Sequence, residues 1–591
     1  MDESPVSLPL LILQSLKETG SGISPLSVLL LIALVCVLTR VVTGVGGRSE
    51  ATFPDGSISP TRAPYWFPYI GHGVLLGFRR RILFEKLRTG RHNALPALYV
   101  QGKDHYVLLT ASLANSLLEK ASSSSNEGPA RYILENVFGA PRNPRFFKRT
   151  DLYSSSGPMQ FLNEDPWLTD IASTVAREIK QAMPNLLSFS QSVVDQSTWE
   201  RLSGVSILDA DSGPICETDL FALVRNFIGV ISTTAIMGKS FTEAFPYSLN
   251  DLWEFDKNFN AMLLGVPRWV PFPGLVTSYA ARRRLLLALK AFHNALAATE
   301  IGVDPGFDWQ DMDDVSEVIK SRSRSMVDAG YTAEQAAAEH LFFLWTLNLT
   351  TNTIVFWNLV HILSDKELHG RILEETRLCA QASRPNWQES GFNIPEPPRL
   401  SLDPDKIASA CPLLKATYME TLRVYSTPIS YRRLNNDIIL EESSSAATNR
   451  NSIAYRCEAG SYVAIPHFIH NTDPEHFPEP RKFDPQRFLA QLLEDGVDSQ
   501  TEVVSVENES LLSSELVSKG IDDIWPDGIN DMFSYSRSFA ERQALLFTAS
   551  FLAMWDIQRA DGKAWEVLPS RNGSATCVPK RDIRVKMKLK I

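Results

Sequence analysis

Glu420 and Arg423 are a pair of side chains whose types and spacing suggest specific chemistry. They stand three residues apart in the segment YMETLRVYS, so a helix there places a carboxylate and a guanidinium on one face. An exposed ion pair of this kind contributes about 0–1 kcal/mol, and such pairs are common on helix surfaces. The pair therefore gains a functional meaning only from the other segments of the chain.

The segment HNTDPEHFPEPRKFDPQRFL, further along the chain, supplies that context. It carries an ordered set of residues: His470, Asp473, Pro474, Phe483, Pro485, Arg487 and Phe488. Together with YMETLRVYS it resembles the cytochrome P450 family, and the segment YWFPYIGH resembles the proline-rich entry of that family. The resemblance runs roughly from Pro60 to the C-terminus. It implies that Glu420, Arg423 and Arg487 form a buried structural triad that supports the haem-binding loop.

The haem loop of this family has the pattern Pro-Phe-Gly-x-Gly-x-x-x-Cys-x-Gly-Arg-x-Phe-Ala. Laid without gaps over WPDGINDMFSYSRSFA, the pattern matches at these positions: Pro526, Gly528, Arg537, Phe539 and Ala540. It fails at four others, where Asp527 replaces Phe, Asn530 and Ser536 replace Gly, and Ser534 replaces the cysteine that binds iron. Arg537 and Phe539 are thus remnants of a haem loop without its ligand. An error in reading the gene would explain one changed position more readily than four.

The replacement of cysteine by Ser534 has a chemical consequence. A cysteine thiol ionises near pH 8.5, whereas a serine hydroxyl resembles bulk water and has a far higher pKa. A hydroxyl also lacks the soft sulfur donor that favours O–O cleavage in haem-thiolate enzymes. We therefore expect no cofactor and no metal, with haem held by another ligand as the alternative.

The segment LFFLWTLNLTTNTIVFW corresponds to the long helix over the haem pocket of the family. Typical members place an acid before a threonine there to deliver protons, but here Leu349 stands at the acid position and Thr350 at the alcohol. The helix resembles that of the sterol 7α-hydroxylase and prostacyclin synthase branch, which departs from the same pattern yet keeps its cysteine. Asn348 and Thr350 are the candidate pocket residues. The alternative is that these two polar residues satisfy one another inside the helix.

Periodicity predicts a mostly α fold with small β-sheets. Apolar residues recur at helical spacing in four ranges: 170–183, 220–237, 280–298 and 332–363. Strand-like runs such as HYVLL and GSYVAIP are short and few. We expect one P450-like domain over residues 61–591, interrupted by an acidic, Ser-rich loop at 490–524.

An uncharged apolar run starts at Pro25 and can be extended through Val45, which predicts a transmembrane anchor at residues 23–45. A cleaved signal peptide is the alternative, but the preceding residues lack its basic n-region. Arginines follow the run, so the positive-inside rule predicts a lumenal tail at 1–22 and a body facing the cytosol from the endoplasmic reticulum membrane. A linker at 46–60 is expected between the anchor and the domain.

Composition excludes some partners. The net charge is −10 and the pI about 5.6, without a basic stripe, so nucleic acid is not expected to bind. The six cysteines are scattered and suggest neither a disulfide framework nor a zinc site.

These observations predict a membrane-anchored, haem-free protein on a cytochrome P450 scaffold. The expected reaction is a non-oxidative cyclisation or isomerisation of a lipophilic natural product, a terpenoid or polyketide of secondary metabolism. Such an enzyme needs no obligatory reductase. Two alternatives stay open: a haem-dependent monooxygenase with an unconventional ligand, and a noncatalytic binding partner of an oxygenase.

Overall fold

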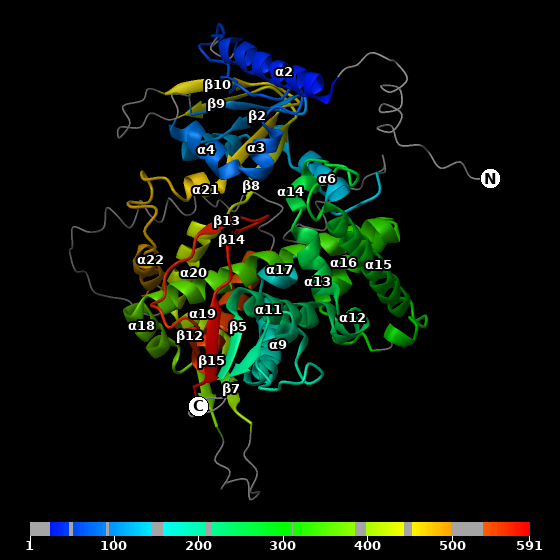
Figure 1. Cartoon of the computed structure of the whole chain (residues 1–591), viewed down its shortest axis with the longest axis vertical. Helices are drawn as coiled ribbons and strands as arrows, with labels where there is room; N and C mark the ends of the chain where they lie inside the picture. Colours follow the sequence, from blue (N-terminus) through cyan, green and yellow to red (C-terminus); the bar gives the residue numbers. More distant parts are fainter. Residues whose placement is uncertain are drawn as a thin grey trace, which may run out of the picture.

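The computed structural model shows a mostly helical protein with small sheets, as the sequence predicts (Figure 1). It describes these residues: 24–46, 51–89, 94–142, 158–208, 215–309, 311–384, 397–442, 452–497 and 536–590. The chain has two zones in Figure 1, where helix α2 lies beside the N-terminal sheets at one end and the helical body forms the rest.

The bounds of the elements are as follows. The helices are α2 Pro25–Gly46, α3 Gly73–Phe78, α4 Arg80–Thr89, α5 Ala111–Glu119, α6 Glu127–Asn136, α8 Gln160–Asn163, α9 Trp167–Ala182, α10 Thr198–Arg201, α11 Leu220–Met237, α12 Lys239–Ala244, α13 Ser248–Asp256, α14 Phe259–Leu263, α15 Leu275–Glu300, α16 Glu317–Asp328, α17 Ala333–Ser364, α18 Lys366–Thr376, α19 Pro404–Ala410, α20 Pro412–Tyr425, α21 His467–His470, α22 Gln486–Val497 and α24 Arg537–Met554. The strands are β1 Ala97–Val100, β2 Lys103–Val107, β3 Ser124–Ser125, β4 Ser206–Leu208, β5 Ile215–Asp219, β6 Ala380–Ser383, β7 Arg399–Leu402, β8 Ile429–Leu434, β9 Ile438–Glu442, β10 Ile453–Cys457, β11 Tyr462–Pro466, β12 Trp555–Arg559, β13 Ser570–Asn572, β14 Cys577–Pro579 and β15 Arg584–Leu589.

Helix α17 runs through the centre of the body (Figure 1). It begins with a capping box, in which Thr332 Oγ1 accepts from Gln335 N at 3.3 Å and the Gln335 side chain accepts from Thr332 N at 2.9 Å. Neither Pro nor Gly interrupts it. Most of its residues are buried, so this helix can carry side chains into the interior from several directions.

The predicted strands at HYVLL and GSYVAIP are present and lie side by side. Strand β2 pairs in parallel with β11, with Val463 opposite Tyr106. They belong to a five-stranded sheet of order β1-β2-β11-β8-β3, which lies between α2 and the helical body (Figure 1). A second sheet of order β12-β15-β5-β4 lies near the C-terminus, and β13 and β14 form a separate hairpin.

Two described helices are long and apolar enough to cross a membrane. The segment Leu26–Val45 of α2 has a mean hydropathy of 2.6 and none of it is buried, so it is a candidate anchor. The segment Leu220–Met237 is α11, which is mostly buried in the core.

One of the two predicted irregular segments differs from the structure. The predicted linker at 46–60 is described from residue 51 and has only turns and isolated bridges there; Ile58 N donates to Ala454 O at 2.9 Å and the Ile58 side chain packs against the N-terminal core. The acidic loop was expected from residue 490, but α22 continues to Val497. Leu489 is buried and Leu492 packs against the core, so an apolar helix face outweighs the acidic composition there.

Candidate functional site

Glu420 and Arg423 form a buried ion pair on α20. Arg423 Nε donates to Glu420 Oε2 at 2.7 Å, and Nη2 donates to Oε1 at 2.8 Å. Their side chains are 0% and 2% exposed. Arg487, at the start of α22, places its Nε 3.5 Å from Glu420 Oε1. The structure thus brings the three residues of the predicted triad together.

The ion pair also holds the loop that precedes α22. Arg423 Nη1 donates to Asn471 O at 2.7 Å and to Pro480 O at 3.0 Å. From the same loop, Asp484 N donates to Glu420 Oε1 at 2.9 Å. Most donors of Arg423 are therefore used on Glu420 and on backbone carbonyls, which is an arrangement suited to fixing a loop rather than to reacting with a ligand.

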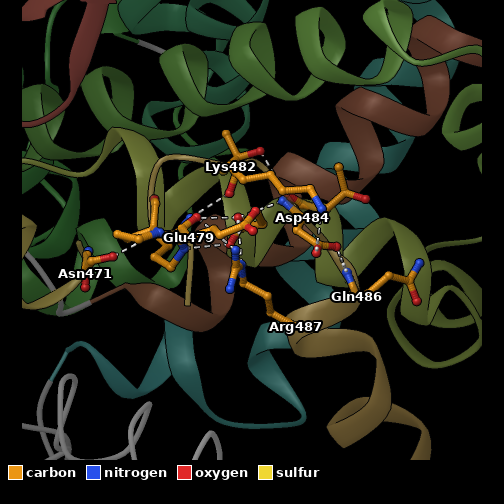
Figure 2. Close-up of polar contacts among 11 residues, drawn as sticks. Asn471, Glu479, Lys482, Asp484, Gln486 and Arg487 are labelled. Carbon is orange, nitrogen blue, oxygen red and sulfur yellow. Dashed lines mark hydrogen bonds and ion pairs between the residues drawn. The ribbon is translucent and has the colours of Figure 1, made fainter. Parts of the chain in front are cut away.

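Arg487 secures a strained point of this loop. Its Nη2 donates to Glu479 O at 3.1 Å (Figure 2). Glu479 has a φ of 50°, which is unusual for a residue other than glycine and costs of order 1–3 kcal/mol. Arg487 Nε is buried without a hydrogen-bond partner, so its interaction with Glu420 is Coulombic.

An aromatic stack joins this loop to α17. The rings of His361 and Phe483 are 3.6 Å apart and nearly parallel, and His361 Nε2 lies 2.9 Å from Tyr425 Oη. Tyr425 in turn stacks on Trp357 at 4.1 Å, and Trp357 Nε1 donates to Cys577 O at 2.7 Å. The stack couples α17, α20 and the β13–β14 hairpin to the loop.

His361 should make the stability of the protein pH-dependent. Burial lowers the pKa of His361 from 6.5 to about 3, so its stabilising effect is complete above pH 6.5 and is lost as the pH falls toward 3. At pH 5 the loss should be roughly 2 kcal/mol. Melting temperatures between pH 8 and pH 5 should therefore fall less steeply for His361→Phe than for the wild type. Equal slopes would contradict this prediction.

The structure separates the two candidate pocket residues of α17. Asn348 is fully buried, and its Nδ2 donates to Thr233 Oγ1 on α11 at 3.2 Å and to Leu344 O at 3.0 Å. Thr350 lies two positions along and hence on another face, where it and Leu349 are partly exposed. The interpretation that Asn348 and Thr350 satisfy one another is wrong, because α11 supplies the partner of Asn348.

The structure describes only part of the segment predicted to be a remnant haem loop. Phe539 is 1% exposed and belongs to the main core, whereas Arg537 is exposed at the first residue of α24. Ser536 stands directly before that helix. Three further loop positions lie outside the described residues: Asp527, Asn530 and Ser534.

The donor atoms of the chain do not fit a haem held through a thiolate of this loop. No cysteine occurs between Cys457 and Cys577, and α24 begins at Arg537 between them. All six cysteines are described, and they lie in or beside α2, α20, β5, β6, β10 and β14. Among the described residues, no group of three or more His, Cys, Asp or Glu side chains could hold a metal ion.

A groove of about 500 Å³ lies between α4 and the loop before α22. Charged side chains dominate its lining: Arg81, Glu85, Arg88, Glu479, Arg481 and Lys482. Sites for lipophilic ligands are lined mainly by apolar and aromatic residues, so this groove is not a candidate for one.

Two charged residues that the sequence analysis did not select lie near the middle of the fold. Asp256 Oδ1, at the end of α13, accepts from Trp345 Nε1 at 2.9 Å, and burial raises the pKa of Asp256. Arg225 is the only charged residue of α11 and lies over the Trp253 ring at 4.8 Å. A single arginine within an apolar helix was the signal in the sequence that could have identified it.

The chain is similar to known proteins over about half its length. The family model for cytochrome P450 matches residues 209–499. Cytochrome P450 monooxygenase efuG of Hormonema carpetanum is 24% identical over 370 residues, which cover 59% of this chain and 60% of that protein. Cytochrome P450 monooxygenase nodJ of Hypoxylon pulicicidum is 24% identical over 328 residues, covering 55% and 57%.

A mammalian relative extends the comparison. The 7-alpha-hydroxycholest-4-en-3-one 12-alpha-hydroxylase of Oryctolagus cuniculus is 24% identical over 271 residues, which cover 44% of this chain and 48% of that protein. The chain thus spans less than two thirds of the length of each of these curated relatives.

Proposed function

The chain belongs to the cytochrome P450 family, and we propose that it is a haem-free member that catalyses a non-oxidative cyclisation or isomerisation of a lipophilic natural product. A terpenoid or polyketide of secondary metabolism is the proposed substrate class. The relatives named as monooxygenases support an enzyme on this scaffold.

The distribution of cysteines is the observation that carries this proposal. The segment before α24, where the family places its iron ligand, contains no cysteine, and Ser534 stands at the corresponding position. Other described thiols are poor substitutes, because burial raises the pKa of Cys216 to about 12 and also raises those of Cys411, Cys457 and Cys577. A serine hydroxyl does not supply the thiolate on which the oxygen chemistry of the family depends.

The retained triad favours a folded, working protein over a decaying one. Glu420 and Arg423 keep their two short hydrogen bonds, and Arg487 still reaches them. In a protein without a function, mutations of one triad residue would not be removed by selection. Each such mutation would leave a buried charge unpaired and lower the stability of the fold. We therefore assign these three residues a structural role.

A cyclisation fits a scaffold of this kind without a metal. A pocket that holds a flexible lipophilic chain in one conformation removes the entropic barrier of a unimolecular ring closure. Asn348, which is buried, and Thr350, which is partly exposed, are the proposed pocket positions in the middle of α17. In this proposal the chemistry requires neither NADPH nor a reductase partner.

A haem-dependent monooxygenase with an unconventional ligand is the second candidate. The relatives named as cytochrome P450 monooxygenases are the observation that favours it. An absorption spectrum of the purified protein separates the two candidates, because only the second one contains haem.

We also propose that α2 anchors the protein in the endoplasmic reticulum membrane, with residues 1–22 in the lumen and the domain at 61–591 in the cytosol. Arg40 lies near the body end of α2 and donates to Pro64 O, and a positive charge at this end supports the proposed cytosolic orientation of the body.

Protease treatment of intact microsomes should therefore digest the body without detergent and leave an N-terminal epitope protected. A lumenal resident protein serves as the control for sealed vesicles. Protection of the body until detergent is added would contradict the proposed topology.

A further inference from the structure

Arg225 carries a guanidinium that the described part of the chain leaves without a polar partner. Its Cζ lies 5.3 Å from the centre of the Phe221 ring and 4.8 Å from that of Trp253 on α13. Its Nε is fully buried and donates to no acceptor among the described residues, while the residue as a whole is half-buried. The outer nitrogens of the guanidinium thus remain free to donate.

The nearest carboxylates do not neutralise this group by contact. Asp582 accepts from the backbone nitrogens of Phe221 at 2.7 Å and Ala222 at 3.0 Å, where it caps the start of α11. Asp256 accepts from Trp345. Both carboxylates act on Arg225 electrostatically, but neither forms an ion pair within 4.0 Å with it among the described residues. Burial lowers the pKa of Arg225 to about 10, so it stays charged at neutral pH.

A second unused donor lies beside it. Asn226 is 2% exposed, and its Oδ1 accepts from Trp253 Nε1 at 2.8 Å, whereas its Nδ2 has no partner. A buried guanidinium Nε and a buried amide donor that both lack acceptors are unfavourable, so their occurrence together suggests that a ligand supplies the missing acceptor.

We propose that Arg225 binds the carboxylate of a lipophilic acid, with Asn226 Nδ2 as an additional donor. A guanidinium presents two parallel N–H groups that match the two oxygens of a carboxylate. The rings of Phe221 and Trp253 lie within cation–π distance of the guanidinium and favour its charged form. This inference narrows the proposed substrate class to lipophilic acids. The lipophilic part of the ligand rests on the proposed function, whereas the carboxylate is inferred from Arg225 and Asn226.

Binding of dodecanoate and of its uncharged amide to the full-length protein in zwitterionic nanodiscs tests this site. The wild type should bind the acid at least about tenfold more tightly than the amide, after subtraction of binding to empty discs. Arg225→Gln should weaken the acid to the level of the amide and leave the amide unchanged. Equal binding of both probes to the wild type, or no binding of either, would overturn the proposal.

Thermal stability distinguishes a ligand-binding arginine from a structural one. Arg225→Gln should lower the melting temperature less than the matched control does, because the described residues give the Arg225 side chain no hydrogen bond or close ion pair to lose. Arg282→Gln is the matched control, since Arg282 lies over Tyr279 at 4.7 Å but donates to Asn136 O at 2.9 Å and Val137 O at 3.0 Å. This control should lower the melting temperature and preserve the preference for the acid.

The outcomes separate this inference from the proposed function. A fall in melting temperature for Arg225→Gln as large as that for Arg282→Gln would overturn the inference, because Arg225 would then be structural. A stoichiometric haem in the wild type would overturn the haem-free function and leave the preference for the acid intact.

Discussion

Replacing Arg423 with alanine should lower the free energy of unfolding by roughly 3 to 5 kcal/mol. The side chain of Glu420 is 0% exposed and Arg423 supplies two of its hydrogen bonds, so the substitution leaves a buried carboxylate largely uncompensated. The carbonyls of Asn471 and Pro480 lose their donor at the same time. Yield and melting temperature should therefore fall together.

The chain contains a matched control for this substitution. Glu374 and Arg377 have the same types and the same spacing near the end of α18, but their side chains are 74% and 63% exposed. Arg377→Ala should change the free energy of unfolding by less than about 1 kcal/mol. The contrast between the two substitutions isolates the effect of burial from that of the helical ion pair itself.

A double variant separates a lost interaction from a stranded charge. Glu420→Gln together with Arg423→Met removes both charges and should recover part of the stability that Arg423→Ala loses. An Arg423→Ala protein that folds with normal stability but has lost turnover would instead give Arg423 a direct role in chemistry.

The sequence predicted the helices whose apolar patterns are strong. The range 220–237 coincides with α11, because an almost uninterrupted apolar run is buried on most sides. The predicted range 280–298 starts too late, because α15 begins at Leu275. Gly274, directly before the helix, takes a left-handed conformation and sets the start of α15. Residues 490–497 were misjudged because acidic composition was given more weight than the spacing of Leu489 and Leu492.

The candidate site was predictable where a family motif encodes it. Glu420, Arg423 and Arg487 could be placed together by resemblance, but their backbone partners could not, because carbonyls carry no signature in a sequence. Asn348 shows the same limit, since its partner Thr233 is distant in the chain and is brought near only by the packing of α11 on α17. Arg225 lacks a hydrogen-bonded carboxylate because Asp582 and Asp256 bond to other groups. These contacts depend on the tertiary structure and cannot be read from the sequence.

Purified wild-type protein should show no Soret band and no carbon-monoxide difference peak of the kind that the family resemblance implies for thiolate ligation. Ser534 offers a hydroxyl in place of a thiol, so iron would lack its usual donor. Asn530 and Ser536 stand where glycine permits close approach of the backbone, and Asp527 brings a charge to an aromatic position. Peptide mapping of the same preparation should confirm these four residues.

Ser534→Cys alone should restore neither signal, because the three other positions would still oppose haem. Adding Asp527→Phe, Asn530→Gly and Ser536→Gly to Ser534→Cys rebuilds the family pattern and is the matched positive variant. Haem uptake by the fourfold variant only would locate the cause in the loop. Haem uptake by Ser534→Cys alone would contradict this prediction, because it would show that the wild type lacks only the iron-binding thiol.

Turnover provides the independent half of this prediction. A cyclisation driven by conformational restriction consumes no electrons, so it should proceed without NADPH, reductase or oxygen. It should also survive Ser534→Ala, since the hydroxyl has no assigned part in the reaction. Stoichiometric haem in the wild type, or turnover that requires NADPH and oxygen, would reject the haem-free proposal and favour the monooxygenase with an unconventional ligand. The decisive comparison is therefore between turnover with and without oxygen in one preparation whose haem content has been measured. A cyclase should be equally active in both conditions, whereas a monooxygenase should be active only with oxygen.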